Sequence, residues 1–271
     1  MKKTFLFVMF AAMGSYLCAE NFTVKSPNSQ LSVNVETGKN TTYSVVFKGK
    51  TIINPSPISM TFDNGIVIGR NMKVVNVENF SEDKTIIPVV RQKSDKIQDT
   101  YNEMVLNADK YSIRFRVYDD GLAYRFHTNF SDSVKVLSEE ATFCFPEDYN
   151  TLFPEERTML SAQQPLFKPM KLSEIATDKF CSTPMLIKLD DQARLFISES
   201  DLESYPGMFL KKQGKYEMAG KYAAVSLEDR KTDDRQIFPT KRADYIAHVN
   251  GTRNFPWRAM IVAENDANLV T

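Results

Sequence analysis

The stretch Leu195–Leu210, LFISESDLESYPGMFL, places three carboxylates directly after an apolar run: Glu199, Asp201 and Glu203. The apolar run predicts a buried strand, and the Tyr-Pro-Gly that follows the acids predicts the end of regular structure. Acidic groups held at the end of a rigid strand are suited to binding a metal ion or to docking a partner. The alternative is a solvated acidic turn with no chemical role, which composition alone favours.

Two carboxylates that face each other across a sugar would indicate glycoside hydrolysis. The spacing of the acidic residues does not show which of them converge, and most carboxylates of a globular protein are solvated. The candidates are Glu103, Asp119, Asp120, Glu139, Glu140, Glu199, Asp201 and Glu203. The sequence has no Gly-x-Ser-x-Gly elbow, P-loop or glycine-rich dinucleotide turn, so it gives no support to esterase or nucleotide chemistry.

Other residues that could bind a ligand have structural interpretations that we favour. Asp119-Asp120-Gly121 could bind a cation through oxygen ligands, but a hairpin turn needs the same residue types. The two histidines, His127 and His248, are far apart, and no Cys/His cluster accompanies them, which argues against a zinc site. Trp257 could stack on a sugar, but we expect it to pack against a neighbouring domain.

The composition is that of a folded protein with a sizeable core. Of the 271 residues, 42% are hydrophobic and 25% are charged. The chain has 34 basic and 34 acidic residues and a formal net charge of zero. This balance gives no electrostatic reason to expect nucleic acid or an anionic membrane as a partner.

The N-terminus has the features of a secretory signal. Lys2 and Lys3 precede the apolar run Phe5–Ala12, which is too short for a membrane span. We predict cleavage after Ala19, so that residues 1–19 are a signal peptide and the protein is exported to the periplasm. Lipid attachment at Cys18 is disfavoured, because the residues before it are not the small ones of a lipoprotein signal.

Cleavage would leave two cysteines in the mature chain, Cys144 and Cys181. An exported protein can form a disulfide, but a domain of this size does not need one for stability. A disulfide and two separate buried thiols both remain open.

Short strands separated by tight turns run through the rest of the chain. The clearest hairpin joins Tyr111–Tyr118 to Leu122–Thr128, because both segments alternate apolar and polar residues around Asp-Asp-Gly. More than a dozen such strands and no long amphipathic helix predict an all-β fold, a single large antiparallel β-sandwich over residues 20–271.

Several segments are expected to be irregular. Pro55 and Pro57 should interrupt a strand, because proline cannot donate to the ladder. Residues 147–178 lack periodicity and are expected to form a long loop with a short helix near Leu172–Thr177. Two separate strands are expected at Val74–Phe80 and Thr85–Val90, and a polar connection is expected after Leu227, through Asp234.

Five segments together resemble the N-terminal domain of glycoside hydrolase family 97. They are PSPISMTFDNG at 55–65, YNEMV at 101–105, FRVYDDGLAYRF at 115–126, ISESDLESYPGMFL at 197–210 and FPWRAMIVAE at 255–264. The resemblance spans essentially the whole mature chain in the right order. It is nearer to the retaining α-galactosidase type of the family than to the inverting α-glucosidase type.

The resemblance implies a galactose-mutarotase-like super-sandwich that packs on a (β/α)8 catalytic barrel. The catalytic carboxylates would belong to that barrel, so this chain would have no catalytic residues and would be inactive alone on an α-galactoside or α-glucoside. In the family, one glutamate of the sandwich coordinates a calcium ion in the active site. That glutamate matches Glu199, with Glu203 close by, and the barrel would complete the calcium shell.

Three hypotheses follow. The first is the exported, non-catalytic domain of a calcium-dependent α-glycosidase, and the chain's end at Thr271 is expected to be a cut before the barrel. The second is a free-standing carbohydrate-binding module without hydrolase activity. The third is a structural surface protein that binds neither sugar nor calcium.

Overall fold

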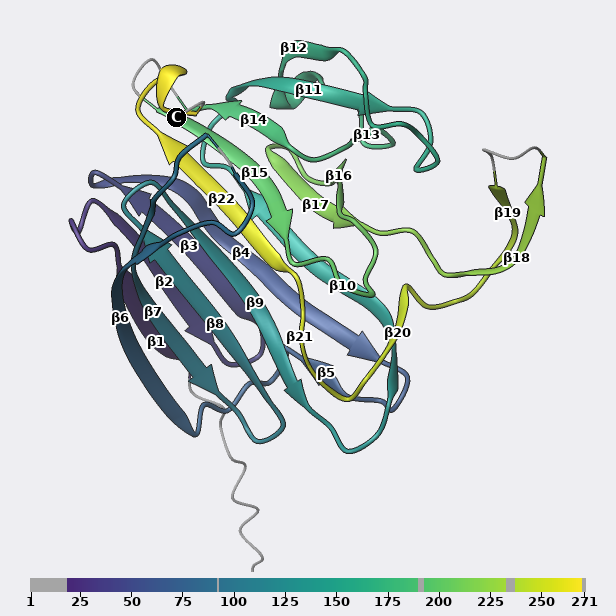
Figure 1. Cartoon of the computed structure of the whole chain (residues 1–271), viewed down its shortest axis with the longest axis horizontal. Helices are drawn as coiled ribbons and strands as arrows, with labels where there is room; N and C mark the ends of the chain where they lie inside the picture. The colour runs from purple at the N-terminus through teal and green to yellow at the C-terminus, as the bar shows by residue number, and fades with distance from the viewer. Residues whose placement is uncertain (1–18, 92, 190–192, 233–236, 270–271) are drawn as a thin grey trace, which may run out of the picture.

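The computed structural model describes residues 19–91, 93–189, 193–232 and 237–269. The predicted signal peptide lies almost entirely outside the described residues, as does Cys18. Among the described residues, no helix has the length and apolar character to cross a membrane. The fold is all-β, as predicted, and its long strands stack in two antiparallel layers (Figure 1).

One layer is built mainly from the N-terminal strands, which pair in chain order. In Leu31–Thr37 and Thr41–Phe47, every second residue is buried, so one face of these strands is turned toward the core. The strands are β1 (Glu20–Lys25), β2 (Leu31–Thr37), β3 (Thr41–Phe47), β4 (Lys50–Phe62) and β10 (Val134–Cys144), with β5 (Val67–Ile68) beside β4 and β20 (Ala247–Val249) beside β10.

The second layer is the one that carries the functional candidates, and it lies in front of the first in Figure 1. Its antiparallel order brings the last long strand, β22, between β9 and β15. The strands in spatial order are β6 (Asn76–Ile86), β7 (Ile97–Asn107), β8 (Tyr111–Tyr118), β9 (Gly121–Asn129), β22 (Trp257–Ala263), β15 (Arg194–Ser200), β14 (Met185–Lys188) and β11 (Asn150–Glu156).

Short strands join the two layers and decorate their ends. A bridge of three strands runs from β10 to β11, and one hairpin pairs only with itself. These elements are β17 (Glu217–Lys221), β16 (Phe209–Lys212), β13 (Phe180–Cys181), the hairpin β18 (Ser226–Lys231) and β19 (Ile237–Arg242), β12 (Phe167–Lys171), β21 (Thr252–Asn254), and the 3-10 turns η1 (Leu172–Glu174) and η2 (Ala267–Leu269).

The core lies between the layers and is rich in aromatic residues. Tyr43 from the first layer contacts Tyr124 and Phe115 from the second, at ring-centroid distances of 5.3 and 6.4 Å. The Tyr43 hydroxyl donates to the Thr142 carbonyl oxygen at 3.0 Å, so the buried phenol is satisfied. Each fully buried apolar side chain contributes about 1.5–3 kcal/mol, which makes this interface the main source of stability.

The predicted hairpin is confirmed as β8 and β9. The two prolines do not interrupt β4, because the strand passes them with local register shifts, where the missing N–H of a proline is tolerated. The predicted strands Val74–Phe80 and Thr85–Val90 are wrong as separate elements, since β6 runs without a break from Asn76 to Ile86.

The expected long loop at 147–178 is also wrong in part. It contains β11 and β12, which pair with each other, and only the short 3-10 turn η1 stands where a helix was expected. The expected polar connection through Asp234 is instead bounded by β18 and β19, which pair as a hairpin, although Asp234 itself lies outside the described residues. In the first region, β11 also pairs with the more distant β13 and β14, so tertiary pairing decides the structure although local periodicity is weak.

Cys144 and Cys181 are both free thiols. Cys181 is buried and Cys144 is half-buried. Burial raises the thiol pKa of each above its ordinary value, so neither is an activated nucleophile.

Candidate functional site

Strand β22 presents two neighbouring side chains to opposite sides of the second layer. Successive residues of a strand alternate between faces, so Trp257 and Arg258 point in opposite directions. Arg258 lies opposite Glu199 of β15 and Tyr124 of β9 in the register, and only 1% of its side chain is exposed. It therefore lies on the core side, whereas Trp257 lies on the outer side.

Inside the sandwich, Arg258 binds two glutamates. Its Nε and Nη2 donate to the two carboxylate oxygens of Glu139, both at 2.7 Å. Its Nη1 donates to Oε2 of Glu199 at 2.6 Å. Because Glu139 comes from β10 of the first layer, this buried triad of Glu139, Arg258 and Glu199 connects the two layers by charge-assisted hydrogen bonds.

The buried triad also fixes the loop that follows β15. Oε1 of Glu199 accepts a hydrogen bond from the backbone N–H of Met208 at 2.8 Å, and the Tyr205 hydroxyl donates to Glu139 Oε2 at 2.8 Å. A Cβ atom at Gly207 would lie 3.3 Å from Glu199 Oε1, so the glycine allows the close approach of the backbone to the carboxylate.

One guanidinium is shared by two carboxylates in this buried site. Burial raises the pKa of Glu199 above its ordinary value, and Arg258 offsets this only in part. Burial opposes the charge of Arg258, but the Glu139 carboxylate outweighs it, so the Arg258 pKa lies well above its usual range. The guanidinium also lies 5.1 Å from the ring centroid of Tyr222.

These surroundings do not fit Glu199 as an open calcium ligand in this chain. Both of its oxygens already accept hydrogen bonds, its side chain is 8% exposed, and the nearest charge is a cation. No group of three or more acidic, histidine or cysteine side chains that could hold a metal occurs among the described residues. The geometry gives Glu199 a structural role, and its role as a calcium ligand stays a prediction.

On the outer side, Trp257 lies against two arginines. The Arg125 and Arg116 guanidinium carbons lie 4.2 and 4.9 Å from its ring, and Arg116 also lies 4.0 Å from the ring of Tyr101. Planar guanidinium groups stack favourably on aromatic faces. Trp257 therefore packs on arginines of its own chain, and its expected packing against a neighbouring domain stays a prediction.

Acidic side chains neutralise part of this outer face. Glu103 accepts from Arg114 Nη1 and Arg116 Nε, each at 2.9 Å, and Asp201 accepts from Arg125 Nη1 at 2.9 Å. Burial lowers the pKa of Arg125, and the nearby Arg114 and Arg116 lower it further against the opposing effect of Asp201. We call Glu103, Arg114, Arg116, Arg125 and Trp257 the arginine face.

The remaining predicted acids have separate partners. Glu140 binds Arg70 at 2.6 Å, and Asp119 accepts from the backbone N–H of Asn28 at 2.9 Å in the β8–β9 turn. Glu203 is exposed, and its backbone carbonyl oxygen accepts from Arg253.

His127 is half-buried, and its Nδ1 lies 3.0 Å from Asn254 Oδ1. Since Asn254 belongs to the neighbouring β21, the histidine joins two strands, in agreement with its structural interpretation.

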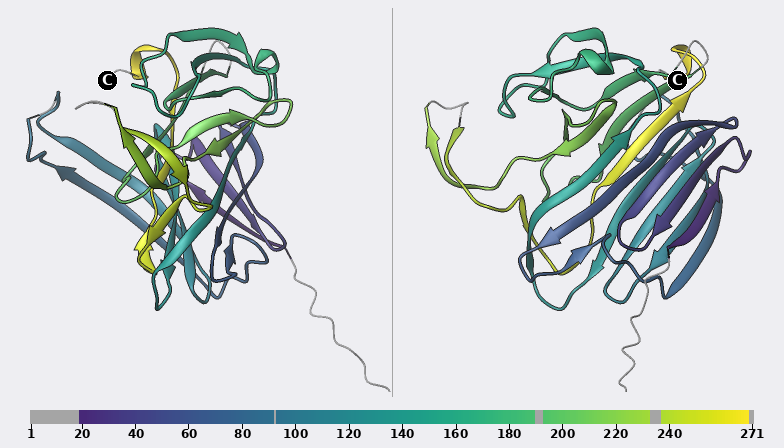
Figure 2. Two further views of the ribbon diagram at one scale, coloured as in Figure 1. Left: turned by 90° about the vertical axis from the view of Figure 1, so that its right-hand side faces the viewer. Right: turned by 180° about the vertical axis from the view of Figure 1, so that it is seen from behind.

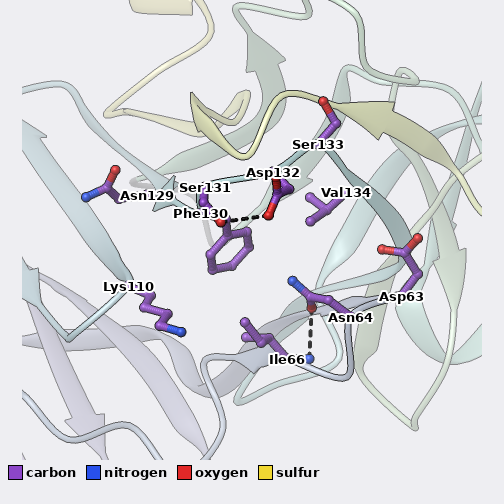
Figure 3. Close-up of a pocket in the computed structure, with 10 residues that line it drawn as sticks. All are labelled: Asp63, Asn64, Ile66, Lys110, Asn129, Phe130, Ser131, Asp132, Ser133 and Val134. Atoms are coloured by element: carbon purple, nitrogen blue, oxygen red, sulfur yellow. Dashed lines mark hydrogen bonds between the residues drawn. The ribbon is translucent and has the colours of Figure 1, made fainter.

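A hollow of about 500 Å³ opens among the turns at one end of the sandwich (Figure 3). Its polar groups serve the turns themselves: Asp63 accepts from the Lys135 N–H, Asn64 from the Ile66 N–H, and Asp132 from the Ser131 hydroxyl. The Asn64 bond is that of an Asx turn, and the Asp63 bond joins its turn to β10, so these polar groups have structural roles.

Sequence reasoning included Glu139 and Glu199 among many acids but did not single out Arg258, which joins them. The available signal is a charged residue at a core position of the alternating segment WRAMIVA, because a buried charge requires a partner. The partner's identity depends on the packing of β10 against β22, which no local pattern encodes.

By its fold, the chain is a large two-layer antiparallel β-sandwich domain. The family model of the glycosyl-hydrolase 97 N-terminal domain matches residues 24–271. The chain therefore belongs to glycoside hydrolase family 97 and corresponds to the N-terminal domain of that family.

Known relatives agree with this assignment. The chain is similar to a retaining alpha-galactosidase of Bacteroides thetaiotaomicron, with 31% identity over 281 residues that include 99% of this chain. The matched part is 42% of that enzyme, so the chain spans less than half the length of its curated relative.

Solved structures share the fold. A family 97 enzyme from Pseudoalteromonas sp. strain K8, solved in complex with acarbose, superposes with a TM-score of 0.78 at 19% identity, over 92% of this chain and 37% of that one. A beta-arabinopyranosidase superposes with a TM-score of 0.72 at 21% identity, over 90% and 40% of the two chains.

Proposed function

We propose that this chain is the non-catalytic supporting domain of an exported α-glycosidase and packs on a catalytic barrel. The observation that carries the proposal is the family match over residues 24–271 to an N-terminal domain that makes up less than half of its relative. The geometry is consistent, because Arg258 holds Glu139 and Glu199 as structural groups. Both oxygens of Glu199 and both oxygens of Glu139 already accept hydrogen bonds within the chain, which suits a structural role.

The substrate class that we propose for the whole enzyme is an α-galactoside or an α-glucoside. The curated relative is named an alpha-galactosidase, and the solved structure from Pseudoalteromonas holds acarbose. The sandwich would act on such a substrate only through the barrel, by shaping and supporting its active site.

A direct test is to assay the chain alone and in a chimera. In the chimera, this chain replaces the matched N-terminal part of the Bacteroides enzyme. We expect the isolated chain to release no product from aryl α-galactosides or α-glucosides, and the chimera to be active. Turnover by the isolated chain that is lost on substitution of one of its own carboxylates would contradict the proposal.

Calcium dependence is a further part of the proposal and rests on the family resemblance. If Glu199 supplies a ligand, the barrel must provide the other oxygen ligands. In addition, one Glu199 oxygen must either lose the hydrogen bond that it accepts in this chain or bind calcium while it keeps that bond. Calorimetric titration of the chimera with calcium should then show binding that Glu199→Gln weakens, while Glu203→Gln leaves it unchanged. Equal binding by both variants would give Glu199 a purely structural role.

The second candidate, a free-standing carbohydrate-binding module, has less support from the geometry. Its main candidate for sugar stacking was Trp257, and two guanidinium groups already lie over that ring. Oligosaccharide binding by the isolated chain that Trp257→Ala abolishes would favour this candidate over ours.

A further inference from the structure

The outer face of the second layer concentrates arginine side chains. Arg114, Arg116 and Arg125 face two carboxylates, Glu103 and Asp201, which leaves one net positive charge on the patch. The arginine side chains are partly exposed, at 34% for Arg114, 25% for Arg116 and 15% for Arg125. A planar guanidinium that is partly exposed is suited to binding a carboxylate of a partner.

Two hairpins frame this side of the molecule. In Figure 1 the second layer lies in front of β2, β3 and β4, so its outer face is turned to the viewer. The left view of Figure 2 shows that side in profile, and both the far ends of β6 and β7 and the hairpin of β18 and β19 project toward it. The arginine face belongs to β7, β8, β9 and β22, the layer whose outer side these two arms flank.

The first arm carries unburied apolar side chains at its end. The segment Ile86–Val90, IIPVV, leaves Ile87, Val89 and Val90 between 71% and 102% exposed. Contiguous exposed apolar residues beside a polar surface mark interaction sites in soluble proteins. A partner that binds both the apolar arm (residues 86–90) and the arginine face would therefore need an apolar surface and carboxylates.

The second arm supports the same conclusion. Hairpin β18–β19 pairs only with itself, and Leu227 and Ile237 are 51% and 59% exposed. An isolated two-stranded hairpin is marginally stable in water, so a surface that covers one side of it would add to its stability.

We propose that the arginine face, together with the apolar arm, is the surface on which the catalytic domain docks, through carboxylates that bind Arg114 and Arg125. The inference rests on the proposed function, because it takes the catalytic domain as the partner. The geometry favours a protein over a sugar, since arginines cover the Trp257 ring and the exposed side chains of the apolar arm offer contact to a second apolar surface.

The test uses the chimera with the Bacteroides enzyme. The double variant Arg114→Ala/Arg125→Ala should lower galactosidase activity at least tenfold and make the two domains unfold separately, because the charge-paired contacts that hold them are lost. Val89→Ser should weaken docking several-fold, and because this side chain is fully exposed it cannot unfold the sandwich. The matched control is Arg70→Ala, an arginine paired with Glu140 outside the arginine face.

The outcomes separate this inference from the proposed function. An active chimera whose double variant and Val89→Ser variant behave like the unmodified protein would overturn the docking surface and leave the proposed function standing. An unmodified chimera whose domains do not associate would overturn both. Dimerisation of the isolated chain that the double variant abolishes would assign the arginine face to a second copy of the chain and would likewise overturn the inference.

Discussion

Both faces of β22 combine arginines with carboxylates, but carboxylates are in excess on the inner face and arginines are in excess on the outer face. On the inner face, one arginine serves two glutamates, all three side chains are buried, and the hydrogen bonds join the two layers. On the outer face, three arginines share two carboxylates, and the arginine side chains are between 15% and 34% exposed. The excess of carboxylates around one buried arginine suits stability, because a buried charge must be paired within the fold. The excess of arginines on the outer face suits association, because a partly exposed charge can bind a partner.

The largest expected effect comes from breaking the buried triad. Arg258→Met would leave the carboxylates of Glu139 and Glu199 buried without their cation, so we expect the free energy of unfolding to fall by about 3–5 kcal/mol. Denaturant titration followed by circular dichroism measures this. Arg70→Met, at the half-exposed pair with Glu140, should cost less than about 1 kcal/mol. Equal losses in both variants would remove the distinction between a buried and an exposed pair.

A pH series sharpens the description of the inner face. The Glu199 pKa is raised in the folded state, so the folded protein binds the proton more tightly than the unfolded chain does. The stability of the unmodified protein relative to Glu199→Gln should therefore fall as pH rises from the ordinary carboxyl value of 4.5 through the raised pKa. The fall should be about 1.4 kcal/mol for each unit by which the pKa is raised. A difference that grows with pH would mean that the pKa is depressed.

The outer face should matter less for folding. Trp257→Ala removes the ring against which Arg116 and Arg125 pack, and we expect the free energy of unfolding to fall by about 1–2 kcal/mol. Trp257→Phe should restore part of this loss, because a smaller aromatic face remains. A loss as large as that of Arg258→Met would place the outer face among the main determinants of stability.

The smallest expected effect on stability belongs to Arg125→Ala. The ion pair with Asp201 is partly exposed, so its removal should change the free energy of unfolding of the isolated chain by no more than about 0.5–1 kcal/mol. The same change should be clearly visible in the docking of the chimera. If stability falls strongly while docking is unchanged, the roles of the two faces are reversed.

The sequence predicted the fold class because its strands alternate clearly, as in the hairpin of β8 and β9. It failed at residues 147–178, where β11 pairs with the more distant β14 as well as with β12, and where β12 carries little alternation of its own. It also predicted a strand followed by an acidic turn at Leu195–Leu210, and β15 ends at Ser200 as that pattern requires.

The candidate site was predictable only in part. Glu199 was singled out, but its burial and its bond to Arg258 arise from the register of β15 against β22, which lie far apart in the sequence. The same holds for the arginine face, because Arg114, Arg125 and Trp257 come together only through the pairing of three strands. Periodicity predicts which face a residue occupies, but not which residues become its neighbours.

Arginine modification read by mass spectrometry, on the isolated chain and on the active chimera, tests the central claim most directly. We predict that Arg258 resists modification in both, that Arg114 and Arg125 react in the isolated chain, and that both are protected in the chimera while Arg70 stays reactive. Equal modification of Arg114 and Arg125 in the two proteins would contradict the claim that this face supports a catalytic domain.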